Sequence, residues 1–264
     1  MTTAVVFEKA RAEGRSALVG YLPAGFPSVE GSITAMRALV DSGVDIIEVG
    51  LPYSDPLIDG PVIQAAADAA LRAGTTTPDV LRVVEAVAAT GAQAVVMSYW
   101  NPLARYGPER FARDLAAAGG AGVITPDLTP DATDDWIPPA RAHDLDTVFL
   151  VAPSSTDERI AMTTAQCRGF VYATSVMGVT GTREQVGDAA AVLVERTRKT
   201  TDLPISVGLG VSNADQAAEI AGFADGVVVG SAFVRRMLEA DDDAAGVAEV
   251  AELAGSLAEG VRRR

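Results

Sequence analysis

Eight short apolar segments, separated by helical patterns, recur along the chain, and this repetition constrains the fold more than any other feature. Their hydrophobicity is continuous rather than alternating, which indicates strands buried on both faces and therefore a parallel sheet. The connecting segments, such as 31–43 and 80–92, space alanine, leucine and valine as amphipathic helices do. The eight apolar segments are 17–22, 45–50, 93–99, 122–125, 146–152, 169–174, 204–210 and 225–230.

Eight β/α units in about 210 residues predict an α/β fold of the (β/α)8 TIM-barrel type. A doubly wound open sheet is the structural alternative. The chain has 264 residues and shows no low-complexity linker or break in composition, so we expect one domain spanning 1–264. Segment 1–15 predicts an extra amphipathic N-terminal helix, and segment 244–264 predicts a terminal helix with a basic end.

Charge and cysteine content narrow the function classes. The net charge of −14 argues against nucleic acid and anionic membranes as partners, because both need a basic patch. It does not exclude a phosphorylated small substrate, since backbone N–H groups bind phosphate. Cys167 is the only cysteine, so an internal disulfide is impossible and we expect a reducing compartment, the cytoplasm. No apolar run reaches the length of a membrane span, and the start lacks the features of a secretory signal.

The segment IIEVGLPYSDPLIDGP, residues 46–61, places Glu48 inside an apolar strand and Asp55 and Asp59 in the loop that follows. Burying an unpaired ionised carboxylate costs several kcal/mol, or the group stays neutral with a raised pKa. Catalytic groups of barrels lie at the carboxyl ends of strands and in the βα loops. All three carboxylates are therefore candidates for the active face, although Asp55 also suits a solvated turn.

Glycine-rich turns follow the last three predicted strands, at 175–184, 207–216 and 228–234. The loops after the seventh and eighth strands of barrels commonly bind phosphate, and glycine lets the backbone approach the ligand closely. These turns predict a phosphate site, although glycines also serve simply to turn corners. We expect Ser231 to cap the last of these helices and to offer its hydroxyl to a phosphate, and Ser212 or Asn213 to cap the one before.

Several reaction classes lack the residues that they need. The two lysines, Lys9 and Lys199, lie away from strand ends, which disfavours a Schiff-base aldolase. The single histidine, His143, cannot supply a metal-binding cluster, and Cys167 precedes the sixth strand, at the wrong end for a nucleophile. No Gly-x-Ser-x-Gly, P-loop or Rossmann motif is present. Carboxylate acid–base chemistry remains, with Glu48 as the buried acid.

Segment 46–61, together with GVITPDL, MGVTG, VGLGVS and ADGVVVGSA, resembles the tryptophan synthase α subunit family over nearly the whole chain. The resemblance implies a (β/α)8 barrel and a lyase that cleaves indole-3-glycerol phosphate to indole and glyceraldehyde 3-phosphate in tryptophan biosynthesis. It implies no cofactor in this chain and a partner β subunit, which carries pyridoxal phosphate, in an α2β2 heterotetramer. It implies no metal site.

The resemblance also implies roles for single residues. Glu48 matches the general acid–base that protonates the indole C3 and helps to remove the glycerol hydroxyl proton. Asp59 matches the carboxylate that holds the indole N–H, and Thr180 a residue that bonds this aspartate when the site closes. Asp55 and Asn101 match positions that contact the β subunit. The expected substrate-binding residues are Tyr99, Tyr172, Thr180, Gly181, Gly210, Gly230 and Ser231.

Two positions depart from the pattern of the family. Phe26 stands where many members carry an aspartate, so the polar contact from that loop is not expected here. Val176 stands where some members carry an arginine, so we expect lid closure to be tuned differently. Asp45, at the start of the second strand, is expected only to cap or pair. Two alternative functions stay open: a free-standing lyase that acts without a partner, and a non-enzymatic activator that only binds phosphate and the β subunit.

Overall fold

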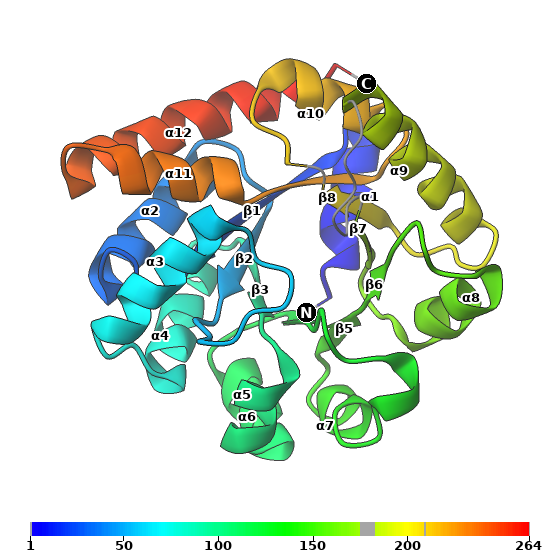
Figure 1. The fold of residues 1–264 in the computed structure, drawn as a ribbon, viewed down its shortest axis with the longest axis horizontal. Coiled ribbons are helices and arrows are strands. Elements are labelled where there is room, and N and C mark those ends of the chain that lie inside the picture. The colour runs from blue at the N-terminus through cyan, green and yellow to red at the C-terminus, as the bar shows by residue number, and fades with distance from the viewer. Residues whose placement is uncertain (1, 175–182, 209, 264) are drawn as a thin grey trace.

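The structure, a computed structural model, describes residues 2–174, 183–208 and 210–263, and side chains in the helix that begins at 183 from residue 188 onward. Within that part, parallel strands form a nearly closed barrel with helices around it (Figure 1). The strands are β1 (Ala17–Pro23), β2 (Ile46–Gly50), β3 (Gln93–Met97), β4 (Gly122–Ile124), β5 (Asp146–Val148), β6 (Leu150–Val151), β7 (Val171–Thr174), β8 (Ile205–Gly208) and β9 (Gly226–Val229).

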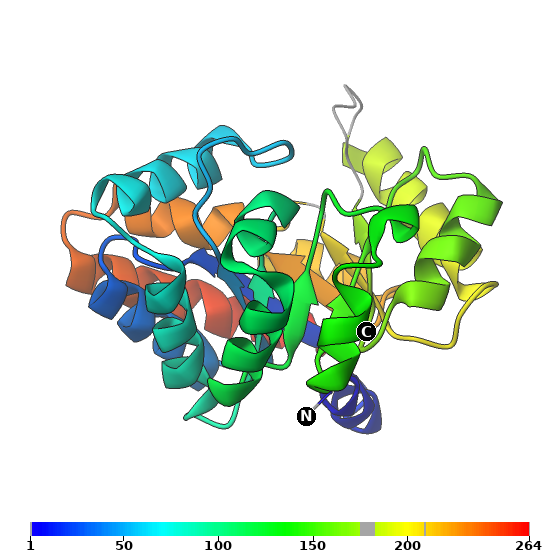
Figure 2. The ribbon, with the colours of Figure 1, turned by 90° about the horizontal axis from the view of Figure 1, so that it is seen from below.

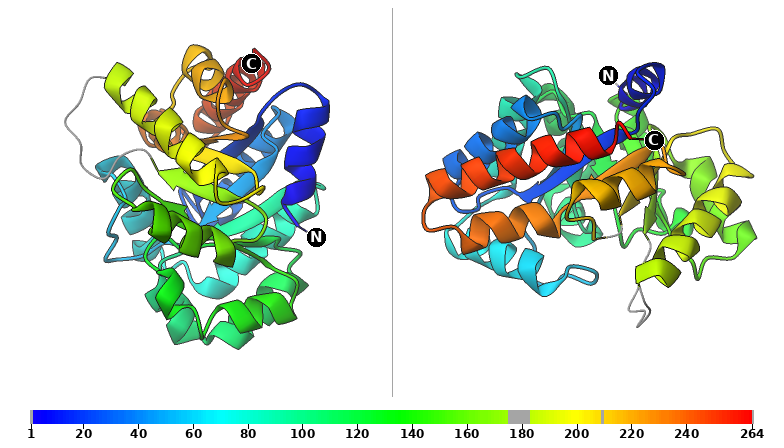
Figure 3. Two further views of the ribbon diagram at one scale, coloured as in Figure 1. Left: turned by 90° about the vertical axis from the view of Figure 1, so that its right-hand side faces the viewer. Right: turned by 90° about the horizontal axis from the view of Figure 1, so that it is seen from above.

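The helices lie mainly between successive strands, as the alternating pattern predicts (Figure 3). They are α1 (Ala4–Ala12), α2 (Val29–Asp41), α3 (Pro61–Arg72), α4 (Thr77–Ala88), α5 (Trp100–Tyr106), α6 (Pro108–Ala117), the 3-10 turn η1 (Pro130–Ala132), α7 (Ile137–Ala142), α8 (Asp157–Gln166), α9 (Arg183–Arg198), α10 (Ala214–Ala221), α11 (Ser231–Glu239) and α12 (Asp243–Gly260). The terminal helix α12 contacts α2, α10 and α11. Among the described residues, no helix is long and apolar enough to cross a membrane.

The strand order confirms the barrel and excludes the doubly wound alternative. It runs β5-β4-β3-β2-β1-β9-β8-β7-β6, so β1 pairs with both β2 and β9 and the order does not reverse in the middle of the sheet. The described residues form nine strands where eight were expected, because Phe149 interrupts the fifth apolar segment. Its first part, β5, pairs with β4 and its second part, β6, pairs with β7. The fifth segment therefore joins the two ends of the sheet.

The apolar side chains form two cores, one outside the barrel wall and one inside it. The outer core fills the space between strands and helices and includes Leu18, Leu22 and Ile47. The inner core includes Val19, Ile46 and residues of α1. Burial on both faces of each strand explains why the apolar segments show no alternation.

The helix α1 covers the amino end of the barrel, opposite the β2–α3 loop (Figure 2). Its Phe7 ring packs against Phe170, with ring centroids 5.4 Å apart. Its start is held by the buried Asp146 carboxylate, which accepts bonds from the Thr3 N–H at 2.6 Å and the Thr3 hydroxyl at 2.7 Å. Asp45, expected to cap or pair, accepts two bonds from the Arg15 guanidinium, at 2.6 and 2.8 Å. The amino end is thus closed by structural contacts, and the opposite end remains for chemistry.

Candidate active site

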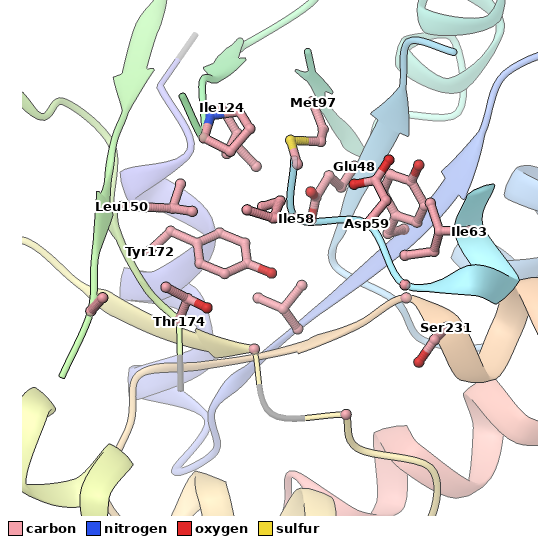
Figure 4. Close-up of a pocket in the computed structure, with 18 of the residues that line it drawn as sticks. Glu48, Ile58, Asp59, Ile63, Met97, Ile124, Leu150, Tyr172, Thr174 and Ser231 are labelled. Carbon is pink, nitrogen blue, oxygen red and sulfur yellow. The ribbon is translucent and has the colours of Figure 1, made fainter. Parts of the chain in front are cut away.

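A cavity of about 450 Å³ opens at the carboxyl ends of the strands (Figure 4). Its size is typical of a site for a small-molecule ligand. Residues from nearly every barrel strand or the loop after it contribute to the wall, which is the arrangement of barrel active sites. The lining residues are Tyr21, Glu48, Ile58, Asp59, Gly60, Ile63, Met97, Ile124, Pro126, Leu150, Ala152, Ser154, Tyr172, Thr174, Gly208, Gly210, Val228, Gly230 and Ser231.

Glu48 enters this cavity from β2, beside Tyr21 and Val95 of the neighbouring strands. Its side chain is only 3% exposed, and its Oε2 atom has no hydrogen-bond partner among the described residues. Burial, reinforced by the negative charge of Asp59, raises the pKa of Glu48 to about 8. A carboxyl group in this state is protonated at neutral pH and can both give and take a proton.

Asp59 lies beside Glu48 at the edge of the cavity, on the loop between β2 and α3 (Figure 4). Burial raises the pKa of Asp59, while a hydrogen bond from the Tyr99 hydroxyl opposes that rise. This bond is 2.9 Å long and ends on Oδ1 of Asp59. The two carboxyl groups therefore differ in environment: that of Glu48 has an unpartnered oxygen, whereas that of Asp59 accepts a hydrogen bond that favours its ionised form.

The rest of the wall is largely apolar, which the sequence analysis did not anticipate. The side chains of Met97, Ile124 and Leu150, at or near the ends of β3, β4 and β6, surround the centre of the cavity (Figure 4). Counting back from each strand end could have found them, because alternate side chains of a barrel strand point inward. Tyr21 and Thr174 were also missed. Such a wall suits a flat apolar ring.

The two tyrosines expected at the substrate differ in position. Tyr172 extends from β7 into the cavity (Figure 4), and burial together with the charge of Glu48 raises its pKa well above the ordinary value. Tyr99 is not among the residues that line the cavity. Its hydroxyl instead contacts the loop that carries Asp59.

The glycine turns after β8 and β9 reach the same cavity through Gly210, Gly230 and Ser231. Gly210 has a φ of +62°, a conformation that side-chain-bearing residues rarely adopt. The prediction that Ser231 caps α11 is wrong, because the helix begins one residue earlier: the N–H groups of Phe233 and Val234 bond to the Gly230 carbonyl. Ser231 is instead the first helical residue, and no described side chain caps this helix.

The remaining expectations concern the cap of α10 and single residues of the loops around the cavity. Asn213 caps α10, as predicted for it or Ser212: its side chain accepts a 3.0 Å bond from the Gln216 N–H. Thr180, Gly181 and Val176 lie outside the described residues. Phe26 packs against the outer core.

The residues expected to contact a partner meet at a separate groove of about 690 Å³ on the same end of the barrel. Asp55 lines it from the β2–α3 loop and Asn101 from α5, and the Asn101 amide donates a 3.1 Å bond to the Tyr53 hydroxyl. Leu57, on the same loop as Asp55, is 74% exposed.

The residues that the sequence analysis excluded from catalysis lie where they were expected. Cys167 precedes β7, and burial raises the pKa of its thiol to about 12, so it is no nucleophile at neutral pH. His143 ends α7, where its Nε2 lies 2.9 Å from a Glu109 oxygen. Lys199 lies near the end of α9, 3.2 Å from Glu195. In the part of the chain that the structure describes, no group of three or more histidine, cysteine or acidic side chains could hold a metal ion.

Comparisons with known proteins agree with this geometry. The family model described as "Tryptophan synthase alpha chain" matches residues 7–262. A tryptophan synthase alpha chain of Acidothermus cellulolyticus is 62% identical over 255 residues, which are 97% of this chain and 95% of the relative. A structure of Mycobacterium tuberculosis tryptophan synthase superposes with a TM-score of 0.92 at 55% identity, covering 98% of both chains.

The likeness extends to more distant structures. The tryptophan synthase subunit alpha of Legionella pneumophila is 30% identical, with a TM-score of 0.89 over 99% of this chain and 98% of that one. Both the family model and the sequence relatives cover nearly the full length, so the match includes the cavity and the strands that build it. The chain therefore belongs to the tryptophan synthase alpha chain family.

Proposed function

We propose that Glu48 and Asp59 carry out the reaction for which this family is known. As a member of the family, the chain is a carbon–carbon lyase of tryptophan biosynthesis, and it cleaves indole-3-glycerol phosphate to indole and glyceraldehyde 3-phosphate. The observation that carries the assignment of residues is the carboxyl pair itself. A buried, largely protonated Glu48 lies beside an Asp59 whose ionised form is stabilised by a hydrogen bond.

The reaction is a retro-aldol cleavage in which the indole ring accepts the electrons. Protonated Glu48 gives its proton to C3 of the indole, and the positive charge that develops on the ring nitrogen is stabilised by the Asp59 carboxylate. The glutamate so formed removes the proton of the glycerol hydroxyl next to the ring. The C–O bond then becomes a carbonyl, the bond to C3 breaks, and its electron pair restores the aromatic ring. Glu48 ends the cycle protonated, as it began.

The rest of the cavity binds the two ends of the substrate. The apolar wall and Tyr172 hold the indole, because burying a flat apolar ring there removes it from water. Backbone N–H groups at the start of α11, with Gly210, Gly230 and the Ser231 hydroxyl, bind the phosphate. The start of α11 is suited to an anion, since its first N–H groups have no partner within the helix. We assign Thr180 and Gly181 to substrate binding on the resemblance alone.

We propose that the groove with Asp55 and Asn101 binds a tryptophan synthase β subunit in an α2β2 assembly. Its support is the position of the groove beside the cavity, together with the exposed Leu57 on the loop that lines the groove. The β2–α3 loop borders both spaces, so a partner on the groove would contact the same loop that carries Asp59. In this assembly the chain itself uses no cofactor, the β subunit holds pyridoxal phosphate, and the complex acts in the cytoplasm.

An assay of indole formation tests the function. The purified chain is supplied with indole-3-glycerol phosphate, alone and with increasing amounts of its β subunit. We expect slow indole release by the chain alone and faster release with the partner. Equal rates at every concentration of β subunit would favour the free-standing lyase. No indole under either condition would favour the non-enzymatic activator and contradict the proposal.

A further inference from the structure

Tyr99 is held rigidly outside the substrate cavity. It is 3% exposed and immediately precedes α5. Its carbonyl accepts a 2.8 Å bond from the Ser98 hydroxyl, and the N–H of the next residue, Trp100, donates to the Asp127 carboxylate at 2.9 and 3.1 Å. Its ring packs against that of Tyr53, with centroids 5.3 Å apart and an angle of 35° between the planes. The backbone and the ring are therefore both fixed.

The Tyr99 hydroxyl makes two hydrogen bonds to the β2–α3 loop. It accepts one from the Ile58 N–H at 3.1 Å and donates one to Oδ1 of Asp59 at 2.9 Å. The loop has no helix or strand between Leu51 and Gly60, so its own secondary structure does not fix the Asp59 side chain. A rigid tyrosine that bridges the backbone and the carboxylate supplies this restraint from outside.

We propose that Tyr99 is a positioning residue for the cleavage: its hydroxyl fixes the Asp59 carboxylate against the Ile58 backbone and keeps it aimed at the cavity. The inference rests on the proposed function of Asp59. Because Oδ1 is occupied by Tyr99, the other carboxylate oxygen is left for the indole N–H. Tyr99 thus acts through Asp59 rather than by touching the substrate.

The charges around Asp59 make this bond important. In the described residues, the titratable groups next to it are Glu48 of β2, Tyr21 of β1 and Tyr99 itself. None of them is positively charged at neutral pH. Burial raises the pKa of Asp59, and among the described residues the bond from Tyr99 is the contact that acts in the opposite direction. Loss of the hydroxyl therefore removes a stabiliser of the ionised carboxylate and leaves the other groups unchanged.

The test is the variant Tyr99→Phe, which keeps the ring and its packing against Tyr53 and removes only the hydroxyl. The first readout is the pKa of Asp59 in the full chain without substrate, followed by NMR of its labelled carboxyl carbon. We expect an upward change of about one pKa unit, which is a tenfold change in the dissociation constant. The matched control is Tyr106→Phe, which deletes a 2.8 Å tyrosine–aspartate bond to Asp114 on the outside of the barrel.

The second readout is the pH dependence of indole formation. Stabilising the positive ring needs ionised Asp59, so kcat falls as the pH drops through its pKa. In Tyr99→Phe this fall should move to higher pH by the same amount as the NMR titration. At the optimum kcat should drop about tenfold with KM within about twofold, because the charge of the ring exists mainly in the transition state. Both readouts use the chain without a partner on the groove that Tyr106 also lines, so Tyr106→Phe should match the wild type.

The outcomes separate this inference from the function on which it rests. An Asp59 titration that is the same in Tyr99→Phe and the wild type would overturn the positioning role, whatever the activity. If the pKa moved but kcat did not, Tyr99 would be only a structural bond and the role in cleavage would be wrong. If the wild type formed no indole, the proposed function would fail, and the NMR titration alone would still decide whether Tyr99 holds the carboxylate.

Discussion

Glu48 should make the stability of the folded chain decrease with rising pH, and the variant Glu48→Gln should abolish that contribution. The pKa of Glu48 is raised from 4.5 to about 8 in the folded chain. Between these values the folded chain binds a proton that the unfolded chain has released. Unfolding therefore becomes easier as the pH rises. The sign is opposite to that of an aspartate stabilised by a salt bridge, whose contribution is lost as the pH falls.

The size of the effect follows from the same values. In this window the free energy of unfolding should fall by about 1.36 kcal/mol per pH unit, or about 5 kcal/mol from pH 4.5 to 8. No discount for solvent screening applies, because Glu48 is 3% exposed. Against the usual 5–15 kcal/mol of total stability this is a large change. A glutamine at this position carries no charge at any pH, so its cost in the unpartnered site is constant.

Urea unfolding of the wild type and Glu48→Gln, measured from pH 5 to pH 9, gives the difference in free energy at each pH. We expect this difference to favour the variant increasingly up to about pH 8 and then to level off. Glu85→Gln, on the exposed side of α4, controls for the loss of one negative charge. Parallel curves for the wild type and Glu48→Gln would refute the reasoning, because they would mean that Glu48 titrates alike in the folded and unfolded chains.

Three further predictions concern the other parts of the site. Asp59→Asn should lower kcat about a hundredfold with little change in KM, since the charge that it stabilises exists mainly in the transition state; steady-state indole assays would contradict this if only KM moved. Gly210→Val should weaken glycerol 3-phosphate binding more than Ser231→Ala does. The valine strains a backbone with φ of +62° and adds bulk at the phosphate, whereas the serine supplies one hydrogen bond of about 1.5–3 kcal/mol. Calorimetric titrations that gave equal, unaltered affinities for both variants would place the phosphate elsewhere. Asp55→Ala should keep the slow activity of the chain alone but reduce its stimulation by the β subunit, and a titration with undiminished stimulation would make Asp55 a solvated turn residue.

The barrel could be predicted from the sequence because the signal is repeated. Each of the eight apolar segments contains a strand of the structure, and the terminal helices α1 and α12 lie where they were expected. The break at Phe149 was not predictable, since the apolar run 148–152 continues through it without interruption. It depends on how the sheet closes, which is a property of the whole barrel rather than of the segment.

The carboxyl pair of Glu48 and Asp59 could also be predicted from the sequence, because an acidic residue inside an apolar strand stands out locally. What the sequence could not show is the environment of each group. The apolar wall from Met97, Ile124 and Leu150 needs the register of three strands. The bond from Tyr99 to Asp59 joins residues 40 positions apart. The cap of α11 was placed at Ser231, one residue after the actual cap Gly230, because glycine and serine both suit the cap position.

The most direct test of the central claim is a comparison of kcat for indole formation by the wild type and Glu48→Gln. Binding of glycerol 3-phosphate is measured alongside as proof that the site is intact. The amide fills the same space but can neither give nor take the proton, and general acid–base groups contribute about 10²–10⁴-fold. We therefore expect kcat to fall at least a hundredfold while the affinity for glycerol 3-phosphate stays within about twofold. A variant that kept more than about a tenth of the wild-type kcat would remove Glu48 from the reaction and contradict the account.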